Sequence, residues 1–247
     1  MPLIKEAFTT IFPEEVSFAF RGPEAPGVLL PEEAAVLGPV GAAERLLDFA
    51  QGRQCARTAL AGLRAQWAEM PVLRQGERMP QWPPGVVGAI AHAGGAAAAV
   101  TAWSPPFLGL GVDLERLRPV SERLWRRILR PEEQQAAAHL PRESRAVDFM
   151  LRFSAKESIF KALYPRGGVY LGFQAATIFP PSDSGPVWRA EKAEASEHTG
   201  HAGQGEFRWR LHQEGGAEFP AGLEGMGSFQ RRGEWVLTGV WVRIPPP

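Results

Sequence analysis

The stretch FLGLGVDLE, residues 107–115, decides the fold because apolar residues alternate in it with small or acidic residues. The apolar positions are Leu108, Leu110, Val112 and Leu114, and the alternate positions are Gly109, Gly111, Asp113 and Glu115. A period of two predicts a strand. It places Asp113 and Glu115 on one face, about 7 Å apart along the strand. Because the two glycines share that face, we expect open space in front of the acids.

The acidic pair on this strand indicates a cation site. Two neighbouring carboxylates repel each other, and each has a raised pKa unless a cation lies between them. Oxygen donors suit Mg²⁺, which binds through one or two carboxylates and completes its shell with water and substrate phosphates. The alternative is a solvated strand edge without a ligand, and the pair alone does not decide between the two.

The second informative stretch is FSAKESIFKALYP, residues 153–165, in a helix expected over residues 144–164. Glu157 and Lys161 are four residues apart, so they share a face, and Lys156 lies beside them. A surface ion pair would be worth only a few tenths of a kcal/mol. However, only four of the 27 basic residues are lysine, and two of these four fall in this stretch. Lysine is a compact point charge whereas arginine is a planar fork, and phosphate chemistry can need the point charge.

The remaining pattern predicts an α+β fold in two lobes, residues 1–105 and 106–247, divided at the Ser-Pro-Pro of residues 104–106. A helix is expected over residues 42–67, with Arg53 on its apolar face, where a guanidinium needs an anion. Two buried strands joined by a His-Ala-Gly-Gly turn are expected over residues 86–103. Further expected elements are a helix over residues 117–129, strands over residues 173–179, 207–212 and 235–242, and a loop or weak hairpin over residues 180–205.

Composition limits the possible functions. The chain has 247 residues, 45% of them hydrophobic, with 27 basic and 27 acidic side chains. Zero net charge argues against a nucleic-acid binder. The single cysteine, Cys55, excludes an internal disulfide and a cysteine-built metal site. The amino terminus lacks the pattern of a signal peptide, and the apolar residues 86–103 are mostly Ala and Gly, so neither secretion nor a membrane span is expected. We expect a cytoplasmic protein.

Together, GVDLE (residues 111–115) and FSAKESIFKA (residues 153–162) resemble the signature pair of the 4′-phosphopantetheinyl transferases. The likeness is to the enterobactin- and surfactin-type members, which are large single chains. Supporting stretches are RLLDFAQGRQCARTAL (residues 45–60), ERMPQWPPGVVGAIAH (residues 77–92) and LGF (residues 171–173). The resemblance implies two related α+β lobes with pseudo-two-fold symmetry, an active site in the cleft between them, and a monomer.

The resemblance also implies an activity, the Mg²⁺-dependent transfer of 4′-phosphopantetheine from coenzyme A to a carrier-protein serine, which releases adenosine 3′,5′-bisphosphate. Asp113, Glu115 and Glu157 would hold Mg²⁺, with Mn²⁺ able to substitute, on the pyrophosphate of coenzyme A. Glu157 would help to deprotonate the serine, directly or through a water. Lys161 would contact the pyrophosphate, and Lys156 would lie along coenzyme A.

Basic positions upstream match residues that bind coenzyme A in the family. Arg45, Arg53 and Arg78 match those that bind its 3′-phosphate and neighbouring groups, and His92 matches a phosphate donor. The alternatives are a structural role for Arg53 and a core position for His92. Ala89 and Ala91 stand where the family has hydroxyl residues, so Ala91 would contribute only its backbone N–H.

Residues 116–130 predict a docking surface for the acidic acyl or peptidyl carrier protein. They hold six arginines against Glu122, namely Arg116, Arg118, Arg123, Arg126, Arg127 and Arg130. Such a patch steers an acidic partner; the alternative is a solvated helix face. Siderophore, polyketide, nonribosomal-peptide and fatty-acid carriers are not distinguished. Two alternative functions remain: a metal-dependent pyrophosphate hydrolase, and an inactive carrier-binding protein. His198 and His201 lack a third ligand, so we expect no metal there.

Overall fold

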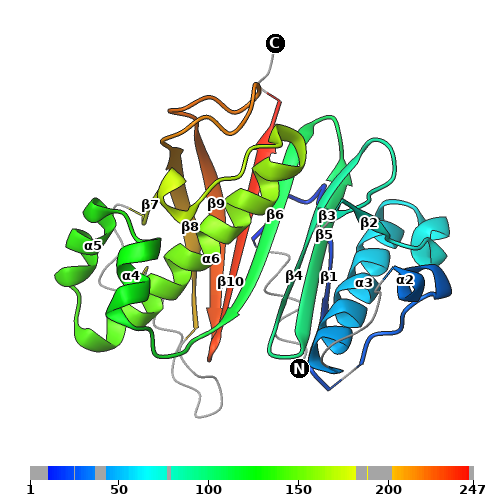
Figure 1. Ribbon diagram of the computed structural model, residues 1–247, viewed down its shortest axis with the longest axis horizontal. Coiled ribbons are helices and arrows are strands. Elements are labelled where there is room, and N and C mark those ends of the chain that lie inside the picture. Colours follow the sequence, from blue (N-terminus) through cyan, green and yellow to red (C-terminus); the bar gives the residue numbers. More distant parts are fainter. Residues whose placement is uncertain are drawn as a thin grey trace.

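The computed structural model describes residues 11–24, 26–36, 43–76, 79–181, 188 and 202–244. It has a mixed α+β fold, as the sequence predicted, with two antiparallel sheets that each carry one long helix (Figure 1). A two-stranded ribbon, β2 (Arg74–Gln75) with β3 (Met79–Pro80), lies beside the first sheet. None of the helices in these described ranges is long and apolar enough to cross a membrane.

The first sheet has the order β1 (Ser17–Arg21), β5 (Ala96–Trp103), β4 (Val86–Ala93), and helix α3 (Ala43–Leu63) packs on it. The predicted pair of strands over residues 86–103 is confirmed, with Gly94 and Gly95 at positive φ in the turn. The run of alanines in β5 is fully buried because side chains pack on it from both faces. Short elements complete this half: α2 (Pro31–Ala35) and the 3₁₀ helix η1 (Ala65–Glu69).

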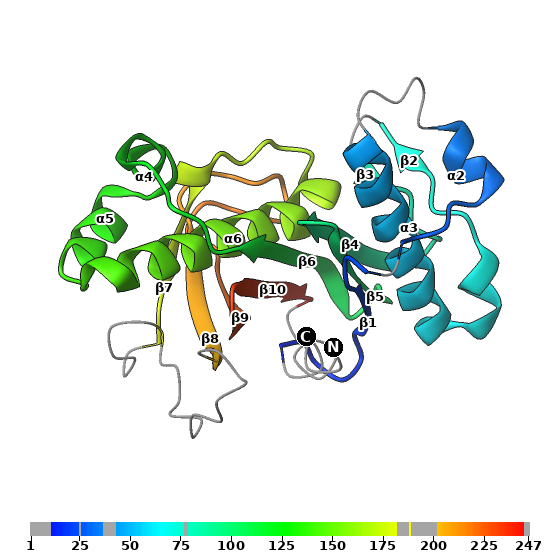
Figure 2. The same cartoon turned by 90° about the horizontal axis from the view of Figure 1, so that it is seen from below.

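The second sheet has the order β6 (Phe107–Arg116), β10 (Trp235–Arg243), β9 (Glu224–Arg232), β8 (Ala202–Leu211), β7 (Ala176–Phe179). Helix α6 (Arg142–Gly167) lies across one face of this sheet, and α4 (Glu122–Ile128) and α5 (Pro131–Ala138) lie near its start (Figure 2). The 3₁₀ helix η2 (Phe173–Ala175) precedes β7. A large apolar core fills the space between α6 and the sheet.

The two sheets meet at β4 and β6, which lie side by side at the inner edges (Figures 1 and 2). A second apolar core lies at this junction and includes Phe107, Leu110, Val112 and Leu114 of β6. The predicted alternation of β6 is confirmed from Gly109 onward: Leu110, Val112 and Leu114 face this core, and the glycines and acids face α6. Leu108 departs from it and packs against the core under α6.

Several boundaries differ from the prediction. The helix expected over residues 117–129 begins only at Glu122, because Pro119 lies in the preceding segment and Ser121 caps the first turn. The first part of the expected strand at residues 173–179 is the 3₁₀ helix η2. The sequence did not predict β1, α5 or β9. Most of residues 180–205, with His198 and His201, lies outside the described residues.

Candidate active site

Strand β6 and helix α6 touch backbone to backbone. A Cβ atom at Gly111 would lie 1.8 Å from the carbonyl oxygen of Ser158, and one at Gly109 would lie 2.0 Å from that of Ala162. The expectation of open space in front of the acids was therefore wrong over the glycines, because α6 fills it. The approach brings Glu157 and Lys161, one residue before each contacting carbonyl, beside Asp113 and Glu115.

Three buried hydroxyl groups fix the helix on the sheet at the same level. Thr238 Oγ1 lies 2.8 Å from Ser154 Oγ and 2.8 Å from Ser158 Oγ, and all three residues are fully buried. Thr238 of β10 pairs directly with Asp113 of β6. The rotation of α6, and with it the direction of Glu157, is thus tied to the strand that carries the acid.

Lys161 is the immediate partner of Asp113. Its ammonium group (Nζ) donates to Asp113 Oδ1 at 2.6 Å and to the Val112 carbonyl oxygen at 3.2 Å. The second carboxylate oxygen, Asp113 Oδ2, is buried and has no hydrogen-bond partner among the described residues. A buried carboxylate oxygen without a donor is costly, so this atom indicates a missing cation or donor.

The pKa values of the two neighbouring acids, Glu115 and Glu157, are raised. Burial and, second, the charge of Asp113 together raise the pKa of Glu115 to about 7, against the opposing effects of Arg118 and Lys161. Burial, followed by the charge of Asp113, also raises the pKa of Glu157, while Lys161 lowers it. One ammonium group therefore does not compensate three carboxylates, which favours binding of a further cation here.

The three acids do not form a finished metal site. Among the described residues, no three His, Cys, Asp or Glu side chains are grouped so that they could hold an ion. The ammonium group of Lys161 instead occupies the place beside Asp113. The donor set still fits a hard divalent cation, because it consists of carboxylate oxygens and includes the unpartnered Oδ2.

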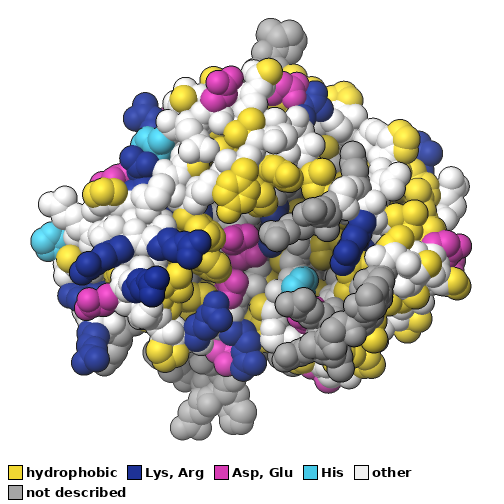
Figure 3. Space-filling model, viewed as in Figure 1, with side chains coloured by type: hydrophobic (Ala, Val, Ile, Leu, Met, Phe, Trp, Pro, Cys, Tyr) yellow, Lys and Arg dark blue, Asp and Glu magenta, His cyan; other side chains and the backbone are white. Residues whose placement is uncertain are grey.

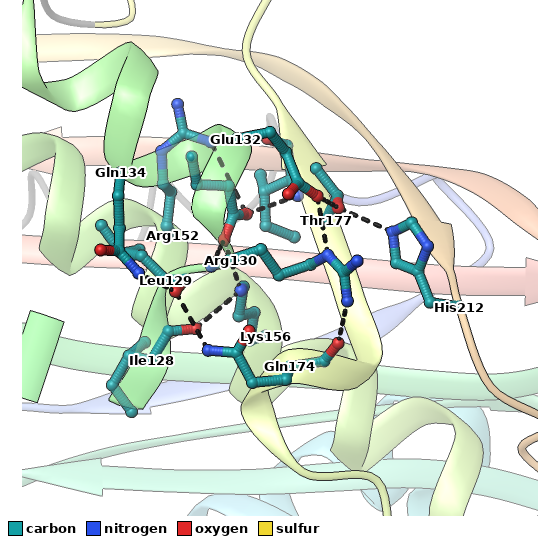
Figure 4. A network of polar contacts seen from close by, with 12 residues as sticks. Ile128, Leu129, Arg130, Glu132, Gln134, Arg152, Lys156, Gln174, Thr177 and His212 are labelled. Atoms are coloured by element: carbon teal, nitrogen blue, oxygen red, sulfur yellow. Dashed lines mark hydrogen bonds and ion pairs between the residues drawn. The ribbon is translucent and has the colours of Figure 1, made fainter. Parts of the chain in front are cut away.

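Lys156 has a different environment from the one the sequence indicated. Its ammonium group is buried and donates to Glu133 Oε2 at 2.6 Å and to the Ile128 carbonyl oxygen at 2.8 Å (Figure 4). Glu133 also accepts from the backbone N–H groups of Arg130 and Ile178. Helix α5 thus supplies the partner of this ammonium group, while Lys156 also lines the cavity beside the acidic cluster, so its expected place along the ligand stays a prediction.

A cavity of about 690 Å³ adjoins the acidic cluster. Gly88, Ala89 and Ile90 of β4 line one side, and α6 and the segment after it line the other. The lining from this second side includes Glu157, Phe160, Lys161, Tyr164, Tyr170, Leu171 and Phe173. The cavity is mostly apolar, with Glu157 and Lys161 as charged groups in its wall, so it suits a long ligand with one polar end. In Figure 3 acidic side chains lie at the centre of this face, beside basic side chains that gather over α4.

The half of the molecule built on the first sheet contributes two cationic side chains, Arg53 of α3 and Arg74 of β2. The guanidinium of buried Arg53 lies 4.3 Å from the centre of the Phe49 ring, and that of Arg74 lies 5.1 Å from the same ring. Arg53 Nε has no partner among the described residues. Burial lowers the pKa of Arg53 to about 10; Glu33 opposes this shift and Arg74 adds to it. An anion bound between the guanidinium groups of Arg53 and Arg74 would compensate both positive charges. Arg74 was not predicted, because the two-residue strand β2 is too short to carry a periodic signal.

The other predicted residues of this half fall into three groups. His92 is half-exposed and its Nδ1 lies 3.4 Å from Asp48 Oδ2, so it is not a core histidine. Ala91 is buried with its methyl group in the core, which leaves only its backbone for a ligand. Arg78 and the side chain of Arg45 lie outside the described residues.

Comparisons with known proteins agree with the motifs. The 4′-phosphopantetheinyl transferase superfamily model matches residues 109–221, and the model of the 4′-phosphopantetheinyl transferase N-terminal domain matches residues 32–102. The chain is 34% identical over 179 residues to 4′-phosphopantetheinyl transferase PptT of Mycobacterium tuberculosis, covering 71% of this chain and 75% of that protein.

Two further relatives are similar. Identity is 36% over 159 residues to 4′-phosphopantetheinyl transferase Svp of Streptomyces mobaraensis, with 64% of this chain and 63% of that protein covered. Identity is 37% over 143 residues to 4′-phosphopantetheinyl transferase Npt of Nocardia iowensis, with 55% and 59% covered. The chain thus spans about three-fifths of the length of these two relatives. A solved holo-[acyl-carrier-protein] synthase of Thermotoga maritima is 19% identical in sequence to this chain. Its TM-score is 0.37, and the match covers 56% of this chain and 65% of that chain.

The buried pair predicts the effect of Lys156→Met. The substitution leaves the Glu133 carboxylate buried without its cation, so we expect a loss of about 3–5 kcal/mol in the free energy of unfolding, measured by urea titration. The double variant Lys156→Met/Glu133→Gln removes the stranded charge and recovers much of the loss. The matched control, Lys161→Met, costs less because Lys161 is partly exposed. Unchanged unfolding in Lys156→Met would contradict the structural role.

The raised pKa of Glu115 predicts a pH dependence of stability. The folded state binds this proton more tightly than the unfolded state, whose value is near 4.5. The contribution to stability is therefore fully present below about pH 4.5 and is lost as the pH rises through about 7. Between pH 5 and 8, the wild type loses up to about 3 kcal/mol relative to Glu115→Gln in metal-free buffer. The exposed control Glu206→Gln shows no such trend, and parallel curves for wild type and Glu115→Gln would refute the assignment.

Proposed function

Because the chain belongs to the 4′-phosphopantetheinyl transferase family, we propose that it transfers 4′-phosphopantetheine from coenzyme A to a serine of an apo carrier protein. The observation that carries this proposal is the meeting of Asp113 and Glu115 with Glu157 and Lys161 beside the 690 Å³ cavity. A diphosphate at this place meets a charged cluster on one side. On the other side it meets apolar space for the pantetheine arm.

The acidic cluster supports a magnesium site. Asp113, Glu115 and Glu157 would hold Mg²⁺, with Mn²⁺ able to substitute; the unpartnered Asp113 Oδ2 and the raised pKa values of both glutamates support this. When bound, the cation neutralises the diphosphate oxygens and the charge that develops on the leaving phosphate. No other metal is required.

The transfer step uses the side chains of α6. Glu157 takes the proton of the acceptor serine, directly or through a water, and burial supports this role because it raises the basicity of the carboxylate. The serine oxygen bonds to the phosphorus next to pantetheine. The bond from that phosphorus to the bridging oxygen breaks, and adenosine 3′,5′-bisphosphate leaves with the electron pair. Lys161 donates to the diphosphate.

The nucleotide end of coenzyme A is assigned to the first sheet. Arg53 and Arg74 would bind the 3′-phosphate or a neighbouring group, supported by the unpartnered Arg53 Nε. His92, oriented by Asp48, would donate to a phosphate. Arg45 and Arg78 keep the same assignment from the family resemblance. Lys156 would lie along coenzyme A, supported by its place in the cavity wall, and its ion pair with Glu133 fixes the position of α6.

The molecular form follows the single-chain, enterobactin- and surfactin-type members. We propose two pseudo-symmetric lobes, residues 1–105 and 106–247, in a cytoplasmic monomer. The support is that each half has one antiparallel sheet covered by one long helix, and that the inner edges β4 and β6 lie beside the cavity (Figure 1).

The carrier protein is proposed to dock on α4 and the segment before it. Arg116 is bound to Glu234, and Arg130 to Glu132 and the Gln174 carbonyl oxygen. Within residues 116–130, all of them described, four exposed arginines have no side-chain hydrogen bond or ion pair, namely Arg118, Arg123, Arg126 and Arg127. A groove of about 340 Å³ beside them is lined by Val120, Leu124, Phe149, Met150 and Phe153. Basic rim and apolar groove suit an acidic partner with apolar side chains at its contact.

The function is tested by mass spectrometry of an apo carrier incubated with the protein, Mg²⁺ and coenzyme A. We expect the carrier to gain one phosphopantetheine. Asp113→Asn and Glu157→Gln lower kcat at least about a hundredfold, and Arg53→Ala mainly raises KM for coenzyme A. The exposed β8 control Arg210→Ala behaves like the wild type.

Two outcomes would replace the proposal. Release of adenosine 3′,5′-bisphosphate without any acceptor would indicate a pyrophosphate hydrolase. Carrier binding without Mg²⁺-dependent uptake of coenzyme A, measured by calorimetry, would indicate a binding protein. No transfer to any of several carriers, of the siderophore, polyketide, nonribosomal-peptide and fatty-acid classes, would count against the transferase.

The docking surface predicts a salt-dependent effect of charge reversal. The triple variant Arg123→Glu/Arg126→Glu/Arg127→Glu raises KM for an acidic carrier by about tenfold or more at low salt, because steering is lost. The kcat at saturating carrier and the KM for coenzyme A stay unchanged, and high salt reduces the difference. Arg208→Glu/Arg210→Glu on β8 serves as the control. An equal loss in the control would show that the effect is not local.

A further inference from the structure

The contact between Lys161 and Asp113 is incomplete as an ion pair. The ammonium group is bound to Asp113 Oδ1 and to the Val112 carbonyl oxygen, but Asp113 Oδ2 stays buried without a donor. Glu115 and Glu157 add two further acids whose charges act on each other and on Asp113. The site therefore holds one cation where its negative charge calls for more.

Lys161 has space into which it can move. Its side chain is 24% exposed and lines both the 690 Å³ cavity and a neighbouring cavity of about 250 Å³. A lysine has a flexible four-carbon stem that carries a point charge. Lys156, five residues earlier on the same helix, is 2% exposed and fixed between Glu133 and the Ile128 carbonyl oxygen. Lys161 thus has room to move, whereas Lys156 on the same helix is held in place.

We propose that Lys161 is an exchangeable internal cation: it occupies the acidic site in the metal-free protein and leaves Asp113 when a divalent cation binds. The displaced ammonium group turns into the cavity, where it meets the diphosphate of coenzyme A. This inference rests on the proposed function of the site. It explains why the three acids are not grouped for an ion in this structure although their charges act on one another.

The exchange has a thermodynamic consequence. A divalent cation that takes the place of the ammonium group beside Asp113 breaks its bond to Asp113 Oδ1, and like charge then repels the ammonium group. The lost bond is regained only when a diphosphate accepts it. Metal and coenzyme A therefore strengthen each other's binding through Lys161, and the coupling is reciprocal.

The first test is Mn²⁺ binding to the full chain, measured by calorimetry without and with coenzyme A. Without coenzyme A, Lys161→Gln binds Mn²⁺ at least about fivefold more tightly than the wild type, which corresponds to about 1 kcal/mol. With coenzyme A, the wild type gains more Mn²⁺ affinity than the variant, because only in the wild type does the diphosphate also accept the displaced ammonium group. Arg118→Gln is the matched control, because it removes a positive charge that acts on Glu115 but makes no bond to Asp113. We expect a smaller effect from it.

The second test uses the wild-type chain, so it does not depend on the folding of a variant. The chain has four lysines, and mass spectrometry can follow each one after brief acetylation. Mg²⁺ releases Lys161 from its two acceptors and raises its labelling severalfold, whereas Lys156 stays protected by Glu133. Coenzyme A with Mg²⁺ protects Lys161 again. In Asp113→Asn, labelling of Lys161 is high without Mg²⁺.

The outcomes separate the exchange from the metal site itself. Metal binding that depends on Asp113, with Lys161 labelling unchanged, would overturn the exchange and leave the proposed metal site standing. An affinity of Lys161→Gln for Mn²⁺ no greater than that of Arg118→Gln would do the same. Absence of any Asp113-dependent metal binding, with or without coenzyme A, would overturn both.

Discussion

The direct contact of helix α6 with strand β6 is the constraint on which the candidate site depends. A side chain at Gly109 or Gly111 would lie about 2 Å from a helix carbonyl oxygen, closer than any real contact. The residues before those two carbonyls are Glu157 and Lys161, and the strand continues from the glycines to Asp113 and Glu115. Removing side chains from two strand positions therefore brings four charged groups together. The hydroxyl groups of Ser154, Ser158 and Thr238 then fix the helix against rotation.

The site keeps an electrostatic imbalance that the ion-pair network around Glu133 avoids. The network around Glu133 has its acids and bases matched: Lys156, Arg152 and two backbone N–H groups face one carboxylate (Figure 4). Around Asp113 one ammonium group faces three acids, and one buried oxygen has no partner among the described residues. Unsatisfied polar groups are costly in a low-dielectric interior, so they persist where a ligand completes them. The contrast within one helix separates a structural network from a functional one.

The sequence predicted the parts of this site that depend on local pattern. Alternation in residues 107–115 gave the strand and placed both acids on one face, and the four-residue spacing placed Glu157 with Lys161. Arg53 on an apolar face predicted a need for an anion. The failures involve partners distant in the chain. The ion pair of Lys156 with Glu133 was not predicted, because Glu133 lies on α5, a helix that the sequence did not predict. The glycines of β6 were interpreted as open space because local pattern does not show which element packs on a face. Arg74 lies in the two-residue strand β2, which is too short to show a period, and only its position over Phe49 reveals it.

The arrangement of charge also explains why the site lies where two sheets meet. The cationic groups Arg53 and Arg74 belong to the half built on the first sheet, and the acids belong to the second. A ligand such as coenzyme A, with phosphates at separate positions, satisfies both sets only if it spans the junction of β4 and β6. Under the proposed function, the arginines bind one phosphate directly, whereas the acids bind the diphosphate only through an intervening cation. Under this function, the opposite signs of these two groups of side chains would give the ligand a direction, with its nucleotide beside Arg53 and Arg74 and its reacting phosphorus beside α6.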